Sequence, residues 1–216
     1  YVISDVHGHI GLLRRLAHAL AEDLREQPVD DASVVFLGDL IDRGPDSRAC
    51  IHAAMGLPIV DGVKQSALLG NHEEYMLRAL RRRDFKRLAS WMFYGGVQTL
   101  LSYGLDEATI DGFAEFPESY VETVAAAAPE THLDWIEGLP RSIAFGDYGL
   151  VHAGVRPGVS LDKQDPHDLV WIREPFLSTE TPLPGRGVVH GHTPTKRIAL
   201  GGDRICIDSG VAYGGP

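Results

Sequence analysis

The 216-residue chain contains 44% hydrophobic and 23% charged residues and carries a formal net charge of −10. This composition is typical of a globular domain that is long enough to bury an apolar core. An acidic balance disfavours a broad nucleic-acid-binding surface, so we expect no stable nucleic-acid partner. No apolar run reaches the roughly 18 to 20 residues that a membrane-spanning helix needs, so we expect no membrane partner either.

The two cysteines, Cys50 and Cys206, are far apart in the sequence. This usage indicates neither a disulfide scaffold nor a thiolate metal site, and it fits a reducing compartment. The sequence opens on a strand-like segment and not on a signal-peptide pattern. A segment upstream of Tyr1 could still carry a targeting signal. On these grounds we expect a cytoplasmic protein.

The first third of the chain alternates strand and helix patterns. Residues 1–4 are predicted to form a strand, and leucines at helical spacing follow from Leu12 to Leu24. Further strands are predicted at 33–37 and 66–69, and both enter polar loops. Parallel strands joined by helices bring their carboxyl ends to one edge of a sheet, where α/β proteins build ligand sites. We therefore expect a site at that edge.

From about residue 73 to residue 138 the pattern becomes helical, which predicts a helical cap or flank inserted between two strand regions. After Pro140, short strands are predicted at 142–145, 150–152, 188–190, 196–200 and 204–207, and we expect them to form a second sheet. The proline-rich segment 175–187 is predicted to be a surface loop. No repeat or low-complexity tract interrupts the chain, so residues 1–216 are expected to form one α/β domain.

Five short motifs each place a metal-binding or phosphate-binding residue at or just after a predicted strand. They are Asp5-Val6-His7-Gly8, Gly38-Asp39-Leu40-Ile41-Asp42-Arg43-Gly44, Gly70-Asn71-His72-Glu73, His152-Ala153-Gly154 and Gly191-His192-Thr193. Each motif alone is weak evidence, because Asp and Asn at strand ends also make turns and helix caps. Five such motifs in one chain indicate that their residues belong to one functional site.

These motifs contain the donor atoms for two divalent cations. Asp5 and His7 lie two residues apart in an extended segment, so their side chains can project to one side. Asp39 has two carboxylate oxygens and can bridge two ions. Mixed oxygen and nitrogen ligands without sulfur favour manganese, with iron or zinc as alternatives. The predicted ligands are Asp5, His7 and Asp39 for one ion and Asp39, Asn71, His152 and His192 for the other.

Two divalent cations together with two carboxylates leave a net charge of +2, which attracts a phosphate. Ions about 3.5 to 4 Å apart would also activate a bridging water for attack on phosphorus. Arg43 and Arg173 are candidates to hold phosphate oxygens through their forked donors. His72 is the candidate general acid for the departing alkoxide, oriented by Asp42, provided that His72 does not itself bind a metal.

With these motifs the sequence resembles the phosphoprotein phosphatase family of calcineurin-like metallophosphoesterases, over nearly its whole length. The resemblance implies a β-sandwich flanked by helices, the same ligands and the same roles for Arg43, Arg173, His72 and Asp42. Residues 70–73 and 42–44 resemble the compact bacterial and phage serine/threonine protein phosphatases in particular. This implies hydrolysis of a phosphoprotein or a small phosphorylated substrate by a metal-bridging hydroxide, without a phosphoenzyme.

Three positions depart from related patterns. Ser4 stands where the family usually has Gly, and we expect only a small effect on the strand end. Symmetric diadenosine tetraphosphate hydrolases typically carry Asp at the position of Glu73 and Trp at that of Thr193, which favours a protein phosphatase. A dinucleoside polyphosphate hydrolase, and therefore a nucleotide substrate, is the alternative. A catalytically silent phosphate-binding module is a third hypothesis, against which the complete ligand set argues.

Overall fold

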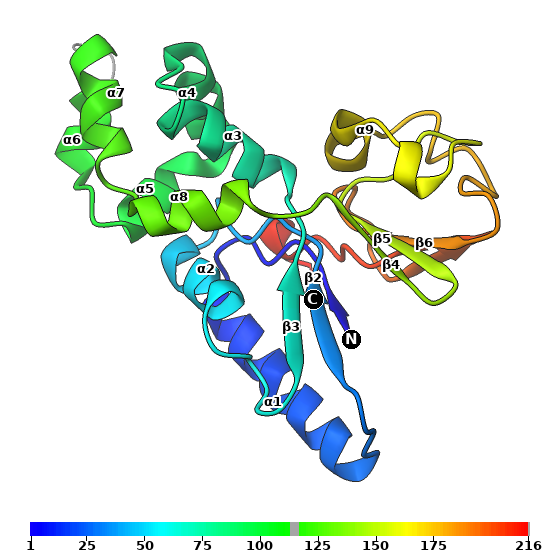
Figure 1. Cartoon of the computed structure of the whole chain (residues 1–216). Coiled ribbons are helices and arrows are strands. Elements are labelled where there is room, and N and C mark those ends of the chain that lie inside the picture. Colours follow the sequence, from blue (N-terminus) through cyan, green and yellow to red (C-terminus); the bar gives the residue numbers. More distant parts are fainter. Residues whose placement is uncertain (113–116, 216) are drawn as a thin grey trace.

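Two β-sheets and a set of flanking helices make up the chain, whose computed structural model describes residues 1–112 and 117–215 (Figure 1). One sheet has three strands in the order β1-β2-β3, and the other has five in the order β4-β5-β6-β8-β7. This arrangement confirms the predicted α/β fold class. In the part of the chain that the structure describes, no helix is both long enough and apolar enough to cross a membrane.

The first sheet is parallel. It consists of β1 (Val2–Ile3), β2 (Ser33–Phe36) and β3 (Lys64–Ala67), and α1 (Ile10–Glu26) and α2 (Ser47–Met55) lie in the connections between them. The third strand begins and ends two residues before the predicted range 66–69. The amide of Leu68 still donates to the carbonyl of Phe36 in β2, but the amide of Leu69 donates to the carbonyl of Pro140. The first two strands lie where the sequence predicts them.

The helical insertion follows β3, as predicted. Its elements are α3 (Asn71–Leu80), α4 (Phe85–Trp91), the π-helical turn η1 (Met92–Gly96), α5 (Val97–Ser102), α6 (Glu107–Asp111), α7 (Pro117–Ala125) and α8 (Glu130–Glu137). Met76, Trp91 and Leu133 of this insertion are fully buried in the same apolar cluster as Phe36 of β2. The insertion therefore shares a core with the first sheet.

The second sheet contains β4 (Ser142–Phe145), β5 (Tyr148–Val151), β6 (Gly187–His190), β7 (Ala199–Gly201) and β8 (Arg204–Cys206). Strands β5, β6 and β8 are parallel, and β4 and β7 pair antiparallel at the two edges. The predicted second sheet is confirmed. Two short helical elements, η3 (Leu161–Lys163) and α9 (Pro166–Trp171), were not predicted from the sequence and lie between β5 and β6 in the chain.

The two sheets pack against each other. Val35, Leu37 and Leu68 from the first sheet and its strand ends form one buried cluster with Leu150 of β5 and Val189 of β6. The helices bury a larger cluster on the outer side of the first sheet, and Val170 and Phe176 belong to a third cluster with β5 and β6. Strands buried on both faces explain the continuous apolar runs in β2 and β6. The carboxyl ends of the parallel strands therefore lie along one edge of this sandwich.

Candidate metal centre

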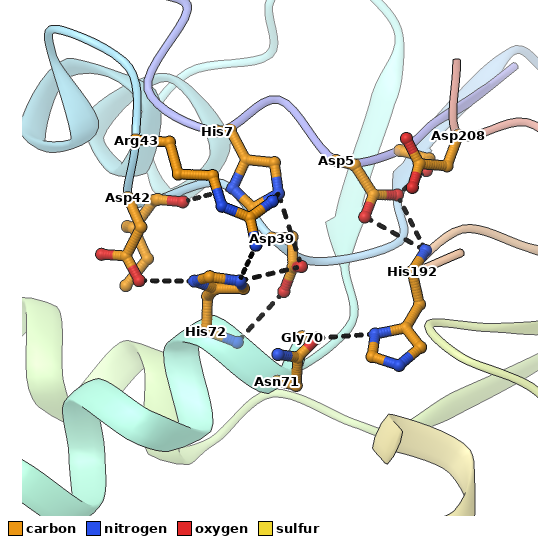
Figure 2. A network of polar contacts seen from close by, with 12 residues as sticks. Asp5, His7, Asp39, Asp42, Arg43, Gly70, Asn71, His72, His192 and Asp208 are labelled. Atoms are coloured by element: carbon orange, nitrogen blue, oxygen red, sulfur yellow. Dashed lines mark hydrogen bonds and ion pairs between the residues drawn. The ribbon is translucent and has the colours of Figure 1, made fainter. Parts of the chain in front are cut away.

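A polar residue follows almost every parallel strand, and these residues meet in one cavity (Figure 2). Asp5 follows β1, Asp39 follows β2, Asn71 follows β3 and His192 follows β6. The cavity is lined by Asp5, His7, Asp39, Arg43, Asn71, His72, Arg173, His192, Pro194, Asp208, Gly210, Ala212 and Tyr213. His152, after β5, is fully buried behind this lining. The edge predicted from the strand pattern is where the candidate residues converge.

Backbone strain is concentrated at the same place. Seven described non-glycine residues have a positive φ, and six of them belong to the predicted site: Asp5, His7, Asp39, Asp42, Arg43 and His192. Such conformations are costly for residues with a Cβ and persist where the surrounding structure holds them, often at functional sites. The alternative reading of these Asp and His residues as ordinary turn residues does not explain why the strain gathers around one cavity.

Asp39 lies between two groups of histidines. Its Oδ1 atom lies 3.4 Å from Nε2 of His152, and its Oδ2 atom lies 3.7 Å from Nε2 of His7. Two potential ligand sets share this carboxylate, one with His7 and His72 and one with His152 and His192. The position of Asp39 is the one that a bridging ligand of two cations requires.

The donor spacing around Asn71 fits a single ion. Its Oδ1 atom lies 2.9 Å from Nε2 of His152 and 2.8 Å from Nδ1 of His192. Ligand atoms held about 2.0 to 2.2 Å from one ion lie about 3.0 to 3.5 Å apart, close to these separations. Nδ1 of His152 faces the carbonyl of Leu37 at 2.9 Å, so a neutral ring has no second proton for Asn71 as oriented in the structure. A cation would resolve this contact between lone pairs.

The protonation of the histidines also suits ligation. Burial lowers the pKa of His7 to about 3 and lowers the pKa values of His152 and His192, so the neutral rings are favoured. Nε2 of His192 is buried and has no hydrogen-bond partner. Burial, with the carboxylates of Asp39 and Asp208, raises the pKa of Asp5 well above its usual value. Divalent cations would relieve this repulsion.

Arg43 spans the other histidine group. Its guanidinium donates to Nε2 of His7 and lies beside Nε2 of His72, each at 3.0 Å. Nδ1 of His7 lies 2.8 Å from the carbonyl of Ile41, which places the ring proton on Nδ1 and leaves the Nε2 lone pair facing the cavity. The Arg43 guanidinium also lies 5.0 Å from the ring centre of Tyr213. Arg43 is thus the cationic side chain closest to the proposed ligands.

Asp5 is held differently from the other candidates. Its carboxylate accepts the backbone N–H of His192 and the hydroxyl of Ser4, and it lies beside Asp208 (Figure 2). Ser4, which replaces the usual Gly, therefore contributes a hydrogen bond to a predicted ligand. Asp208 is 5% exposed and lines the cavity, although it is not among the site residues proposed from the sequence. Its position directly after the strand pattern 204–207 is the signal that would have identified it.

His72 and Asp42 form a close buried pair. Nδ1 of His72 lies 2.6 Å from Oδ2 of Asp42, and Asp42 is completely buried. The indole N–H of Trp91 and the hydroxyl of Thr99 also donate to this carboxylate. Both donors come from the helical insertion, to which the sequence pattern assigned no chemistry. The insertion therefore holds the carboxylate that orients His72.

Arg173 is placed at the mouth of the cavity. It lines the cavity together with His192, and its side chain is exposed. It follows α9 by two residues, so the short helix that sequence analysis missed is what carries Arg173 to the site. All ten residues proposed from the sequence thus lie in or directly behind one cavity. His190, two residues before His192, is buried against Phe176 and does not line the cavity.

Glu73 braces two of the site loops. It is fully buried, and its carboxylate accepts the backbone N–H groups of Asp39 and Gly70 on one oxygen and those of Leu40 and Ile41 on the other. Glu73 does not line the cavity, and neither does Thr193. The two residues that favoured a protein phosphatase in the sequence therefore lie outside the cavity, and they carry less information on substrate than the sequence pattern suggested.

We expect Glu73→Gln to destabilise the protein by about 2 kcal/mol, because the amide nitrogen faces two backbone N–H groups and leaves them without an acceptor. Equilibrium denaturation would measure the loss. Glu22→Gln, on the exposed face of α1, is the matched control and should leave the free energy of unfolding unchanged. Equal stabilities of the two variants would contradict the bracing role.

Comparison with known proteins agrees with this geometry. The chain is 27% identical over its whole length to serine/threonine-protein phosphatase 1 of Salmonella typhimurium, covering 88% of that protein. It is 26% identical to the asymmetrical bis(5'-nucleosyl)-tetraphosphatase PrpE of Geobacillus thermodenitrificans, with 99% of this chain and 86% of that protein covered.

Solved structures share the fold. A structure provisionally assigned as a diadenosine tetraphosphatase has a TM-score of 0.63 at 19% identity and covers 99% of this chain and 84% of its own. A cold-active protein tyrosine phosphatase has a TM-score of 0.58 at 18% identity, with 99% and 70% covered. The family model described as calcineurin-like phosphoesterase matches residues 1–212. The chain therefore belongs to the calcineurin-like phosphoesterase family.

Proposed function

We propose that this protein is a dinuclear metal-dependent phosphomonoesterase that acts as a serine/threonine protein phosphatase. The observation that carries the proposal is the position of Asp39, whose two carboxylate oxygens face two separate histidine groups. The end-to-end similarity to the Salmonella phosphatase supports the substrate class. The proposed ligands are Asp5, His7 and Asp39 for one ion and Asp39, Asn71, His152 and His192 for the other.

Two divalent cations, when bound, would supply Lewis-acid stabilisation of phosphate oxygens and lower the pKa of water. Manganese suits the mixed oxygen and nitrogen donors, with iron or zinc as alternatives. The cavity residues in the described part of the chain include no Ser, Thr or Cys, and the hydroxyl that they do include is the phenol of Tyr213, whose ring packs against the Arg43 guanidinium. This favours direct hydrolysis over a phosphoenzyme route.

The two arginines are proposed to hold the phosphate. Nε2 of His7 has one lone pair, so it cannot both accept from Arg43 and bind a cation. Cation binding at His7 would therefore release one donor of Arg43 for a phosphate oxygen. Arg173, exposed at the cavity mouth, can add a second forked donor.

His72 is proposed to donate the proton to the leaving oxygen. Burial opposes the charged ring, but the carboxylates of Asp39 and Asp42 outweigh it and raise the pKa of His72 above its usual value. A raised pKa favours the protonated ring that a proton donor needs. The Nε2 atom faces the cavity while Nδ1 remains bound to Asp42. This division assigns orientation to Asp42 and proton transfer to His72.

We expect Asp42→Asn to move the basic limb of the kcat–pH profile to lower pH by about one unit or more. The protonated form of His72 is the active one, so kcat falls as the pH rises through its pKa. The Asp42 carboxylate raises that pKa, and its neutral replacement lowers it. Measurement of kcat on a phosphopeptide from about pH 5 to about pH 10 would show the shift. An unchanged basic limb would show that its pKa does not belong to the His72–Asp42 pair.

Dinucleoside polyphosphate hydrolysis is the second candidate function. The observation in its favour is that the bis(5'-nucleosyl)-tetraphosphatase relatives match the chain at nearly the same identity and coverage as the protein phosphatase. The same cations and the same arginines would serve a phosphoanhydride. The two functions therefore differ in the recognition of the departing group and not in the metal centre.

Comparison of three substrates after defined manganese loading tests the proposal. A phosphoserine peptide, a small aryl phosphate and diadenosine tetraphosphate would be compared by kcat/KM. Highest values for the phosphopeptide would support a protein phosphatase. A kcat/KM for the dinucleotide that is orders of magnitude higher would replace it with the second candidate. Failure of manganese, iron and zinc alike to support turnover of any of the three substrates would contradict both functions.

A further inference from the structure

Four aromatic side chains form a continuous surface beside the metal centre, which we name the aromatic wall: Phe93, Tyr94, Tyr75 and Trp171. The rings of Tyr75 and Tyr94 are stacked, with centres 5.8 Å apart and planes 24° from parallel. Trp171 meets Tyr75 edge to face at 5.0 Å, and Phe93 meets Tyr94 in the same way at 5.3 Å. None of the proposed catalytic roles uses these rings.

The inner part of the wall is fixed in place. The indole N–H of Trp171 donates to Glu74, which also accepts from Arg78 at 3.1 Å. Glu74 and Tyr75 are neighbours on α3, so this helix holds Trp171 through both a hydrogen bond and a ring contact. A side chain that is already ordered loses little further conformational freedom when a ligand binds. The wall is therefore preorganised.

The wall adjoins the candidate site at three points. Trp171 lies 6.5 Å, between ring centres, from His192. Tyr75 follows His72 by three residues on α3, a spacing that places two side chains on neighbouring positions of one helix face. Tyr94 precedes Gly95, whose carbonyl accepts the backbone N–H of Arg43 at 3.1 Å. The wall therefore adjoins His192, His72 and the backbone of Arg43, although none of its four residues lines the cavity itself.

The outer part of the wall is open to solvent. Phe93 is 84% exposed and Tyr94 is 48% exposed, although both are large aromatic residues. They sit in η1, a π-helical turn in which Gly95 has a φ of 115°. The positive φ of Gly95 breaks the helical path at this point. Here the turn directs two rings outward next to the residues proposed to bind phosphate and donate the proton.

We propose that the aromatic wall binds a planar ring on the departing group of the substrate. The inference rests on the proposed metal-dependent phosphoester hydrolysis and extends its substrates beyond phosphoserine and phosphothreonine, whose own leaving groups carry no ring, to phosphoesters whose departing group carries one. The proposed proton donor His72 marks the leaving side, and Tyr75 and Tyr94 continue outward from it. An aromatic amino-acid side chain and a nucleobase share this planar chemistry, and both stack on Tyr or Trp.

Binding of non-hydrolysable probes tests the wall without turnover. Calorimetry would compare phenylphosphonate with butylphosphonate on the manganese-loaded protein and on its Tyr94→Leu variant, which keeps apolar bulk but loses the ring. We expect the wild type to bind phenylphosphonate more tightly than butylphosphonate. The ratio of the two affinities should fall about tenfold in the variant. Tyr148→Leu replaces an aromatic residue of similar exposure, 42%, on β5 and is the matched control.

Kinetics on the same proteins distinguish the two sources of the ring. The kcat/KM values for a phosphotyrosine peptide and for diadenosine tetraphosphate would each be divided by that for a phosphoserine peptide. The ratio that falls about tenfold in Tyr94→Leu, and not in Tyr148→Leu, shows which of the two substrates binds its ring on the wall. Unchanged phosphonate preference and unchanged ratios would overturn the wall proposal. Absence of metal-dependent hydrolysis with the phosphonate preference retained would instead count against the proposed function.

Discussion

Replacement of His72 by Asn is expected to lower kcat by about 10³-fold while the protein keeps its metal content. Asn cannot donate a proton at the pH where His72 acts, but its shorter amide keeps a polar group beside Asp42. Proton donation to the leaving oxygen is the contribution that would be lost. The measurements are kcat on a phosphopeptide with a poor alkoxide leaving group and elemental analysis of bound metal.

The structure makes this test demanding, because His72 lies within reach of a ligand set. Its Nε2 atom is 3.9 Å from Oδ2 of Asp39, and its ring centre is 4.8 Å from that of His7. If His72 binds a cation, the variant will lose metal as well as activity, and the assignment as general acid is wrong. An aryl phosphate with a good leaving group gives a second readout, since its hydrolysis needs less proton donation. His18→Asn, exposed on α1, is the control.

Much of this architecture can be predicted because each ligand motif directly follows a strand. Asp39 after β2 and His192 after β6 are reached by apolar runs that are buried on both faces, a pattern that is visible in the sequence. The period of the pattern also separates the helical insertion from the strands on either side. The parallel arrangement then requires that the residues after the strands share one edge.

Other features depend on contacts that sequence spacing does not encode. Helix α9 has only six residues, too few for a periodic pattern, yet it carries Trp171 and leads to Arg173. Trp91 and Thr99 reach Asp42 across 49 and 57 residues of sequence. Glu73 is adjacent to His72 in sequence but points away from the cavity into four backbone amides. The role of each follows from packing between elements, which only the fold determines.

Asp39→Asn is expected to remove the capacity for two cations and to reduce kcat by several orders of magnitude. The substitution keeps the size of the side chain and an acceptor for the backbone N–H of His72, which Asp39 Oδ1 receives at 3.1 Å. It removes one negative charge and one of the two oxygens that face the separate histidine groups. Metal per chain after desalting and the rise in Tm on adding manganese measure the effect.

If Asp39 bridges the two ions, its replacement should lower the metal content more than replacement of a residue that binds only one ion. His7→Asn alters only the set that contains His7, so this variant should retain about one ion per chain where Asp39→Asn retains less than one. Asp147→Asn, an exposed aspartate in the turn between β4 and β5, controls for the change of charge. Two ions retained in Asp39→Asn would contradict the bridge. The phosphate-attracting charge of the cavity would then have to come from Arg43 and Arg173 alone, because they are the only Arg or Lys residues among the cavity residues of the described chain.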